Sequence, residues 1–248
     1  MAENGRVAAV TGASSGIGEA TALALARAGF ALALAARRED RLQDVAKRIA
    51  EGGGRAEVFG CDVTDEQQAR EFVEGANERL DRLDVLVNNA GVMLLGPVDG
   101  ADTDEWRRMV NVNLLGLLYC THAALPIMRE QGGGHIVNVS SVAGRQANLG
   151  SAVYNLTKWG VNGFSEGLRQ EALHSNIRVT VVEPGMTESE LLDHNKNPVV
   201  LEAAKRMREE VGEPLTSEDI ADGIVYAVTA PRRVSVNEVL IRPTGQRR

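Results

Sequence analysis

Histidine and cysteine are scarce in this chain, with four and two residues among 248. Cys61 and Cys120 form no C-x-x-C pair, and the histidines are scattered between positions 122 and 194, so no residues have the spacing of a structural zinc site. We therefore expect no metal, and we expect reduced thiols in a cytoplasmic protein.

Positive charge and long apolar runs are also in short supply. Lys and Arg number 27 against 34 Asp and Glu, which gives a formal net charge of -7 and argues against nucleic acid as a partner. The first residues lack the basic start and apolar stretch of a signal peptide, and no apolar run approaches the ~20 residues of a membrane span. The expected partner is a small molecule, with no membrane involved.

Short apolar or β-branched runs alternate with longer helical patterns, which include 21–28, 41–50 and Glu66–Leu80. Several of the short runs are apolar throughout, as strands are when helices cover both faces of their sheet. The sequence predicts one α/β domain over 1–248, with a Rossmann-type, doubly wound parallel sheet and helices on both faces. Its seven expected strands are Val7–Thr11, Ala31–Ala36, Ala56–Gly60, Val85–Asn88, 135–139, 177–182 and Glu238–Ile241.

The least regular stretch is 186–213, where Asn195, Asn197 and Pro198 separate two possible short helices. It follows the sixth expected strand, and ligands of α/β proteins bind at the carboxyl ends of parallel strands. The stretch is predicted to cover the substrate, and the alternative is a surface insertion.

A glycine-rich turn joins the first expected strand to a helix. Its spacing is G-x-x-x-G-x-G, which differs from the G-x-G-x-x-G of the usual dinucleotide fingerprint. Glycines let the backbone approach a pyrophosphate, and the N–H groups at a helix start favour an anion. The alternative is a turn that binds nothing. The candidate cofactor-binding residues of this turn are Gly12, Ser14, Ser15, Gly16, Ile17 and Gly18.

Two arginines, Arg37 and Arg38, stand at the end of the second expected strand. NAD-binding proteins carry an acidic residue there, which binds the ribose hydroxyls and repels an added phosphate. Guanidinium groups instead bind a phosphate with paired hydrogen bonds. The sequence therefore favours NADP(H), and the alternative is that both arginines only begin a solvated helix.

Tyr154 and Lys158 lie four residues apart in a helix-compatible segment, so their side chains share one face. A neighbouring ammonium favours the phenolate and lowers a tyrosine pKa that is ordinarily near ~10. The pair alone is a common chance pattern. Ser140 and Ser141, however, follow the fifth expected strand, at the sheet edge where ligands bind. The grouping indicates acid–base chemistry.

This set of motifs resembles the short-chain dehydrogenase/reductase family over nearly the whole chain. The matching segments are 11–18, 62–63, 88–91, Asn113, Ser141 with Tyr154 and Lys158, and 184–185. The resemblance implies an NADP(H)-dependent oxidoreductase that moves a hydride between nicotinamide and a carbonyl or alcohol carbon.

The resemblance also implies a role for each matching residue. Ser141 would hydrogen-bond the substrate oxygen, and Tyr154 would give or take its proton. Lys158 would bind the nicotinamide ribose and lower the pKa of Tyr154, and Asn113 would position a water for proton relay. Ser140 and Asn111 are neighbouring candidates that fit the pattern less well. The other implied cofactor contacts are Asp62 and Val63 at the adenine, Asn89, Ala90 and Gly91 along the channel, and Pro184, Gly185 and Thr187 at the nicotinamide.

Segments 90–97, 226–231 and 241–244 look like a bacterial branch of the family that includes clavulanic acid (clavaldehyde) dehydrogenase. This similarity suggests a small aldehyde or ketone without fixing the substrate. The alternatives are a 3-oxoacyl-carrier-protein reductase, which would need a basic docking patch, and a non-catalytic NADP(H)-sensing protein.

Two further expectations concern assembly and the loop after Ser141. Family members usually form tetramers or dimers, so the resemblance implies a homo-oligomer. Arg145 is either part of a substrate wall or an ordinary loop residue.

Overall fold

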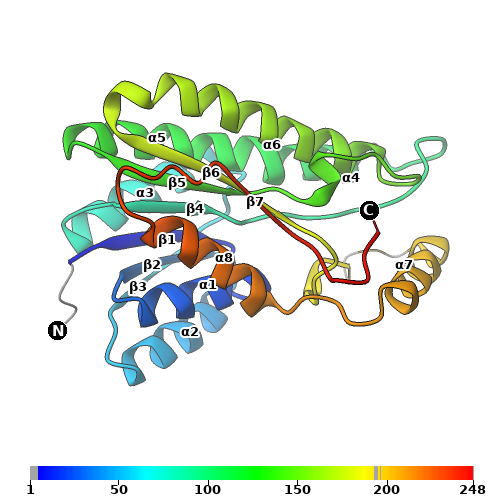
Figure 1. The fold of residues 1–248 in the computed structure, drawn as a ribbon, viewed down its shortest axis with the longest axis horizontal. Coiled ribbons are helices and arrows are strands. Elements are labelled where there is room, and N and C mark those ends of the chain that lie inside the picture. Colours follow the sequence, from blue (N-terminus) through cyan, green and yellow to red (C-terminus); the bar gives the residue numbers. More distant parts are fainter. Residues whose placement is uncertain (1–4, 193–194, 196, 248) are drawn as a thin grey trace.

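The computed structural model describes residues 5–192, 195 and 197–247. Seven parallel strands form one sheet in the order β3-β2-β1-β4-β5-β6-β7, with helices on both faces (Figure 1). This confirms the predicted Rossmann-type sheet, whose order reverses between β1 and β4. The strands are β1 Val7–Thr11, β2 Ala31–Ala36, β3 Ala56–Gly60, β4 Val85–Asn88, β5 Gly134–Val139, β6 Ile177–Pro184 and β7 Glu238–Ile241.

Two strands are longer than the sequence predicts. β5 begins at Gly134, which pairs with Ile177 of β6, and a Cβ there would lie 2.6 Å from Met128 Cγ. Glycine is a poor strand signal, so the sequence pattern begins one residue too late. β6 continues through Glu183 and Pro184, which pair with Leu240 and Ile241 of β7. A charged residue and a proline are poor strand signals, which is why the pattern ends two residues too early.

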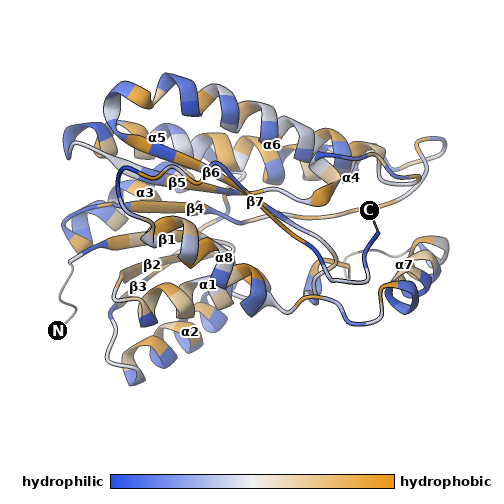
Figure 2. Cartoon of the chain, in the orientation of Figure 1, coloured by the Kyte–Doolittle hydropathy of each residue, from blue (hydrophilic) through white to orange (hydrophobic). Residues whose placement is uncertain are grey.

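The helices form two layers (Figure 1). α1, α2 and α8 cover one face of the sheet, and α3, α5 and α6 cover the other. The apolar residues of strands and inward helix faces meet between the layers (Figure 2). The helices are α1 Gly16–Arg27, α2 Glu39–Glu51, α3 Glu66–Leu80, α4 Thr103–Val110, α5 Leu117–Glu130, α6 Ala152–Glu171, α7 Pro198–Val211 and α8 Ser217–Thr229.

β1 shows why its sequence is apolar throughout. Val7 and Ala9 pack with one core, whereas Ala8 and Val10 pack with the other. The next helix, α1, begins at Gly16, five residues before the predicted 21–28 segment. Glycine has a low helix propensity, so the first turn of α1, which contains Gly16 and Gly18, is not predicted as helix from the sequence.

α4 and α5 are joined by a π-helical turn, η1 Asn111–Gly116, and together form Thr103–Glu130. This helix is long and apolar enough to cross a membrane by length and composition alone, with 33% of the apolar window buried. Its packing with α3, β4 and α6 is that of a core helix. Its π-helical turn carries Asn113 towards the carboxyl edge of the sheet.

The chain after β6 leaves the sheet at its carboxyl edge. It contains a short helical turn, η4 Glu190–Leu192, and α7, which lies apart from the two helix layers near the C-terminus (Figure 1). It returns through a parallel bridge between Thr187 and Leu215 before α8 begins. The irregular 186–213 stretch therefore contains one helix of substantial length.

Candidate active site

α6 places Tyr154 and Lys158 on one face, and each is only 6% exposed. Lys158 Nζ lies 5.8 Å from the centre of the Tyr154 ring and donates to the Val139 carbonyl at 2.9 Å. Burial lowers the pKa of Lys158 to about 8. The site therefore holds an ammonium that gives up its proton far more readily than a surface lysine.

Ser141 follows β5 and begins the short helical turn η2 Val142–Gly144. Its Oγ accepts from Ala143 N at 3.1 Å, and its side chain hydrogen-bonds Tyr154. Burial raises the pKa of Tyr154 to about 12, against the lowering effect of that hydrogen bond. The phenol is thus held neutral with a proton to give.

Asn113 is buried in η1, close to the same pair. Its Nδ2 donates to Val92 O at 2.9 Å and to Thr157 Oγ1 at 3.1 Å, while its Oδ1 accepts from Val92 N at 2.8 Å. A Cβ on Gly91 would lie 3.5 Å from Asn113 Oδ1 and 3.9 Å from Lys158 Nζ. Asn113, Gly91 and Lys158 therefore surround one small region.

The glycine-rich turn packs tightly against the loop after β4. Gly12 has φ +65°, and a Cβ on it would lie 2.9 Å from Asn89 Nδ2 and from Ala90 Cα. A Cβ on Gly18 would collide with Gly12 O and lie 2.5 Å from Asn89 Nδ2. Asn89 Nδ2 itself donates to Thr11 O at 3.0 Å. The glycines are required by this packing, and they keep the backbone bare where a pyrophosphate would approach.

The structure separates the two predicted phosphate-binding arginines. Arg38 donates to Ser14 Oγ at 3.1 Å and to Ser15 Oγ at 2.7 Å, which brings its guanidinium to the glycine-rich turn. Arg37 is exposed, and no hydrogen bond or ion pair is recorded for it within the described residues. Arg38 is therefore the one that lies where a ribose phosphate would be met.

Two residues of this region were missed by the sequence analysis. Glu190 accepts from Arg38 at 2.9 Å and from Arg41 at 2.6 Å, and these two arginines lower its pKa to about 2. Arg41 lies one turn beyond Arg38, so its spacing could have indicated a second guanidinium. Glu190 is 152 positions away from Arg38, and no local pattern connects them.

The remaining predicted cofactor residues line the same edge of the sheet. Asp62 Oδ1 accepts from Thr64 N at 3.0 Å, and Val63 packs on Gly116, where a Cβ would lie 2.7 Å from Val63 Cγ2. Pro184 ends β6, Gly185 N donates to Ile241 O at 2.7 Å, and Thr187 Oγ1 donates to Gly185 O at 3.1 Å. Ile17 lies in the first turn of α1.

Apolar side chains surround Tyr154 on its outer side. Val92, Leu94, Met109 and Ala143 form a buried cluster with it, and a small pocket lies beside Val153. Asn195 closes this end, since its Nδ2 donates to Met93 O at 2.9 Å and its Oδ1 accepts from Leu95 N at 2.7 Å. The walls near the phenol are thus largely apolar.

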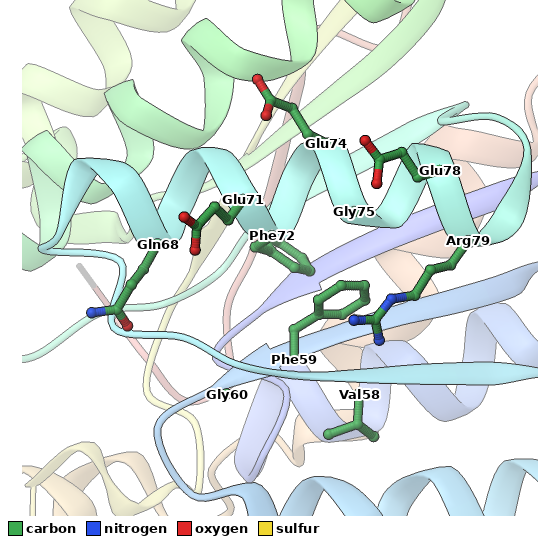
Figure 3. A pocket seen from close by; sticks show the side chains of 10 residues that line it. All are labelled: Val58, Phe59, Gly60, Gln68, Glu71, Phe72, Glu74, Gly75, Glu78 and Arg79. Carbon is green, nitrogen blue, oxygen red and sulfur yellow. The ribbon is translucent and has the colours of Figure 1, made fainter.

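A larger pocket lies elsewhere, at the edge strand β3 and helix α3 (Figure 3). Phe59 and Phe72 meet edge to face with ring centres 5.4 Å apart, and the Arg79 guanidinium lies 4.5 Å from the centre of the Phe59 ring. None of the predicted catalytic residues lines it. Its size does not make it the candidate active site.

Arg145 lies outside the apolar wall. Its Nε donates to both carboxylate oxygens of Glu183, at 2.8 and 2.7 Å, and Asn162 Nδ2 donates to Glu183 Oε1 at 2.8 Å. Of the two readings of Arg145 that the sequence left open, neither includes this ion pair. Across 5–192, 195 and 197–247, no group of three or more His, Cys, Asp or Glu could hold a metal ion.

Comparison with known proteins finds dehydrogenases and oxidoreductases among the similar chains. The short chain dehydrogenase family matches residues 6–198. An uncharacterized oxidoreductase of Staphylococcus saprophyticus is 41% identical over 247 residues, covering 97% of each chain. Serine dehydrogenase complexed with NADP+ has a TM-score of 0.90 at 31% identity, covering 98% of this chain and 96% of its own.

A second similar structure carries a different cofactor. 7α-Hydroxysteroid dehydrogenase complexed with NADH and 7-oxo glycochenodeoxycholic acid has a TM-score of 0.89 at 26% identity, covering 98% of this chain and 95% of its own. The chain is thus similar to structures that hold a nicotinamide cofactor of either kind.

Proposed function

The chain belongs to the short-chain dehydrogenase family, and we propose that it is an NADP(H)-dependent oxidoreductase that interconverts a small aldehyde or ketone and its alcohol. The observation that carries this proposal is the grouping of buried Tyr154 and Lys158 with half-buried Ser141 at the carboxyl edge of the sheet. Parallel α/β sheets bind their ligands at that edge.

Tyr154 is the proton donor for reduction. Because Ser141 Oγ accepts from Ala143 N, its hydroxyl hydrogen is available to the oxygen that faces it, which is the Tyr154 phenol in the structure. A substrate carbonyl oxygen placed between the two hydroxyls would accept a hydrogen bond from each. These hydrogen bonds would stabilise the negative charge that develops on the oxygen, and Tyr154 would transfer its proton to it. The nicotinamide ring, when bound, supplies or takes the hydride.

Lys158 supports the reverse direction, in which Tyr154 must lose its proton. Its ammonium favours the phenolate, and it is the group we assign to the nicotinamide ribose. We assign Asn113 to the relay water, since Asn113 Oδ1 and Lys158 Nζ both face the space beside Gly91. The relay would carry a proton from the buried site towards solvent.

The preference for NADP(H) rests on Arg38. Its guanidinium lies on Ser14 and Ser15 of the glycine-rich turn, where the adenosine ribose of a dinucleotide would end, and the acidic residue expected for NAD is missing from this strand end. The bare backbone between Gly12 and Gly18 fits a pyrophosphate. The remaining contacts to the cofactor would come from Asp62, Val63, Asn89, Ala90, Pro184, Gly185 and Thr187.

The proposed substrate is a small carbonyl compound, in keeping with the small pocket beside Val153. A 3-oxoacyl-carrier-protein reductase is less well supported. Arg38 and Arg41 share the Glu190 carboxylate, and Arg145 pairs with Glu183 and Glu238. Among the described residues, Arg37 is the exposed arginine of this group without a carboxylate partner, and a single guanidinium is less than the basic patch that an acidic carrier protein would need. A sensing role would leave the acid–base grouping without a purpose.

We also propose that 186–213 covers the substrate and that the chain is a cytoplasmic homo-oligomer. Asn195 joins this stretch to the Met93 and Leu95 backbone beside the apolar pocket. Leu156 and Trp159 are exposed on α6, and β7 is an open sheet edge, so a second copy could bury both. Both cysteines are buried and free, as a reducing compartment favours.

The test compares Tyr154→Phe with Tyr226→Phe, a matched control whose ring is 64% exposed on α8. NADPH and NADH consumption is followed with small aldehydes, ketones and β-ketoacyl thioesters. Tyr154→Phe should lose about 10²- to 10⁴-fold in turnover, because it removes only the proton-bearing hydroxyl, and should bind NADPH as before.

Near-normal turnover by Tyr154→Phe would refute the assigned acid. Turnover confined to the thioesters would favour the carrier-protein reductase. Tight NADPH binding without turnover of any compound would favour the sensing role.

A further inference from the structure

A fully buried carboxylate lies next to the candidate site. Glu183 is 0% exposed, although it is the second-last residue of β6 and immediately precedes Pro184. Burying a charge is costly unless it is paired and hydrogen-bonded. Glu183 meets that condition through the Arg145 guanidinium and the Asn162 amide.

The partners of Glu183 come from the two elements that carry the acid–base residues. Arg145 directly follows η2, the turn that Ser141 begins. Asn162 is on α6, one helical turn beyond Lys158 and two beyond Tyr154. The carboxylate therefore joins the serine turn and the tyrosine helix to the strand that ends at the predicted nicotinamide contacts.

Other hydrogen bonds hold the same elements together. Asn162 Nδ2 also donates to Gly144 O at 3.2 Å, and Ser140 Oγ donates to Lys158 O at 3.2 Å. A Cβ on Gly144 would lie 2.8 Å from Asn162 Nδ2, so the turn approaches α6 as closely as its backbone allows. The Ser141 turn is thus fixed against α6 at several points, and the Glu183–Arg145 pair supplies the charged groups among these anchors.

We propose that Glu183, with Arg145 and Asn162, is a positioning clamp that holds the Ser141 turn against the Tyr154 helix for the reaction. The clamp rests on the proposed function, because it acts through Ser141 and Tyr154 and touches neither substrate nor cofactor. The Arg145 Nε–H is shared between the two carboxylate oxygens and Nη2 lies 2.6 Å from Oε2, so the pair fixes the orientation of the turn as well as its distance from Glu183. A glutamine in place of Glu183 offers one acceptor atom instead of two, so the turn loses that fixed orientation.

The experiment compares Glu183→Gln with Glu238→Gln. Glu238 lies on β7 and pairs with the outer side of the same Arg145, but it is 63% exposed. The two variants remove one negative charge each from the same arginine, and only the first changes the buried clamp. Arg145→Gln is the second clamp variant. It leaves the buried Glu183 carboxylate without its cation and should therefore cost more stability than Glu183→Gln, which replaces that carboxylate with a neutral amide.

Three quantities are measured for each variant: kcat and KM with a substrate found for the wild type, the Kd of NADPH, and hydrogen exchange of the 140–147 peptide. Glu183→Gln and Arg145→Gln should lower kcat by about 10- to 100-fold, because the reaction rate depends strongly on the position of the Ser141 hydroxyl relative to the substrate oxygen. The Kd of NADPH should stay within about twofold, since Arg38 and the glycine-rich turn lie at another part of the edge. Exchange of 140–147 should rise, and Glu238→Gln should match the wild type.

An unchanged kcat in both clamp variants would overturn the proposal. So would an equal loss in Glu238→Gln, or faster exchange across the whole sheet, which would indicate general destabilisation. If the wild type turns over nothing, the proposed function fails separately. The clamp is then judged by exchange: a rise confined to 140–147 supports it, and no rise overturns it.

Discussion

Replacing Lys158 by methionine should stabilise the cofactor-free protein while removing its activity. Lys158 is buried with a pKa of about 8, so its ammonium is less favourable in the folded chain than in the unfolded chain. A methionine of similar length fills the same space without charge. The price of the change is the hydrogen bond that Lys158 Nζ donates to Val139 O.

The size of the effect depends on pH in a direction that the pKa fixes. Between pH 8 and the ordinary lysine value of 10.5, the unfolded chain binds more protons than the folded one, so wild-type stability gains as pH rises. The lowered pKa of Lys158 destabilises the folded chain by about 3 kcal/mol at pH 7 and by about 1 kcal/mol at pH 9.5. The stability advantage of Lys158→Met should therefore shrink by about 2 kcal/mol over this range.

Urea unfolding of the two proteins at several pH values between 7 and 9.5 measures this difference. Burial raises the pKa of Cys61 and of Tyr154 to about 12. Cys61 changes stability at alkaline pH equally in both proteins, and Tyr154 contributes little below pH 9.5 because its ordinary pKa is 10.0. Lys47→Met, an exposed lysine on α2, is the control and should give a difference that does not vary with pH. A gap between Lys158→Met and the wild type that stays constant or widens with pH would refute the reasoning.

Three further outcomes are expected. Glu190→Gln should tighten NADPH binding several-fold but leave NADH binding unchanged, because it frees Arg38 for a phosphate; calorimetric titration with both cofactors checks this, and equal changes would contradict it. Gly18→Ala should lower the free energy of unfolding by about 1–3 kcal/mol, since its Cβ would collide with Gly12 O, whereas Gly167→Ala, with no atom near its Cβ, should be neutral or stabilising. Asn195→Ala should raise KM for the carbonyl substrate more than Kd for NADPH, and steady-state kinetics with fluorescence titration would show the reverse if Asn195 served the cofactor.

The sheet could be predicted because helices cover both of its faces, and several of its strands therefore consist almost entirely of apolar residues. The predicted boundaries were wrong where a residue is atypical of the element that contains it. Because of Gly16 and Gly18, the predicted start of α1 is too late, and because of Glu183 and Pro184, the predicted end of β6 is too early. In each of these cases, the tertiary packing decides the structure and local propensity does not.

The predicted site residues had motifs to reveal them, whereas the residues that hold them did not. The four-residue spacing of Tyr154 and Lys158 made this pair a candidate from the sequence alone. Glu183 and Arg145 are 38 positions apart, and a glutamate in an apolar run gives no sign of its partner. Such pairs depend on which loops the sheet order brings together, and that order is a property of the whole chain.

The stretch after β6 connects the two ends of the candidate site in a way that neither motif suggests. Its Glu190 reaches Arg38 and Arg41 at the cofactor end, and its Asn195 reaches the Met93 and Leu95 backbone at the substrate end. The carboxylate on Arg38 occupies donors that a ribose phosphate would need, so phosphate and Glu190 compete for one guanidinium. Displacing Glu190 would remove one of the contacts that hold this stretch at the edge of the sheet. If this stretch covers the substrate, as we propose, cofactor binding and access of the substrate to Tyr154 would be coupled through the same short piece of chain.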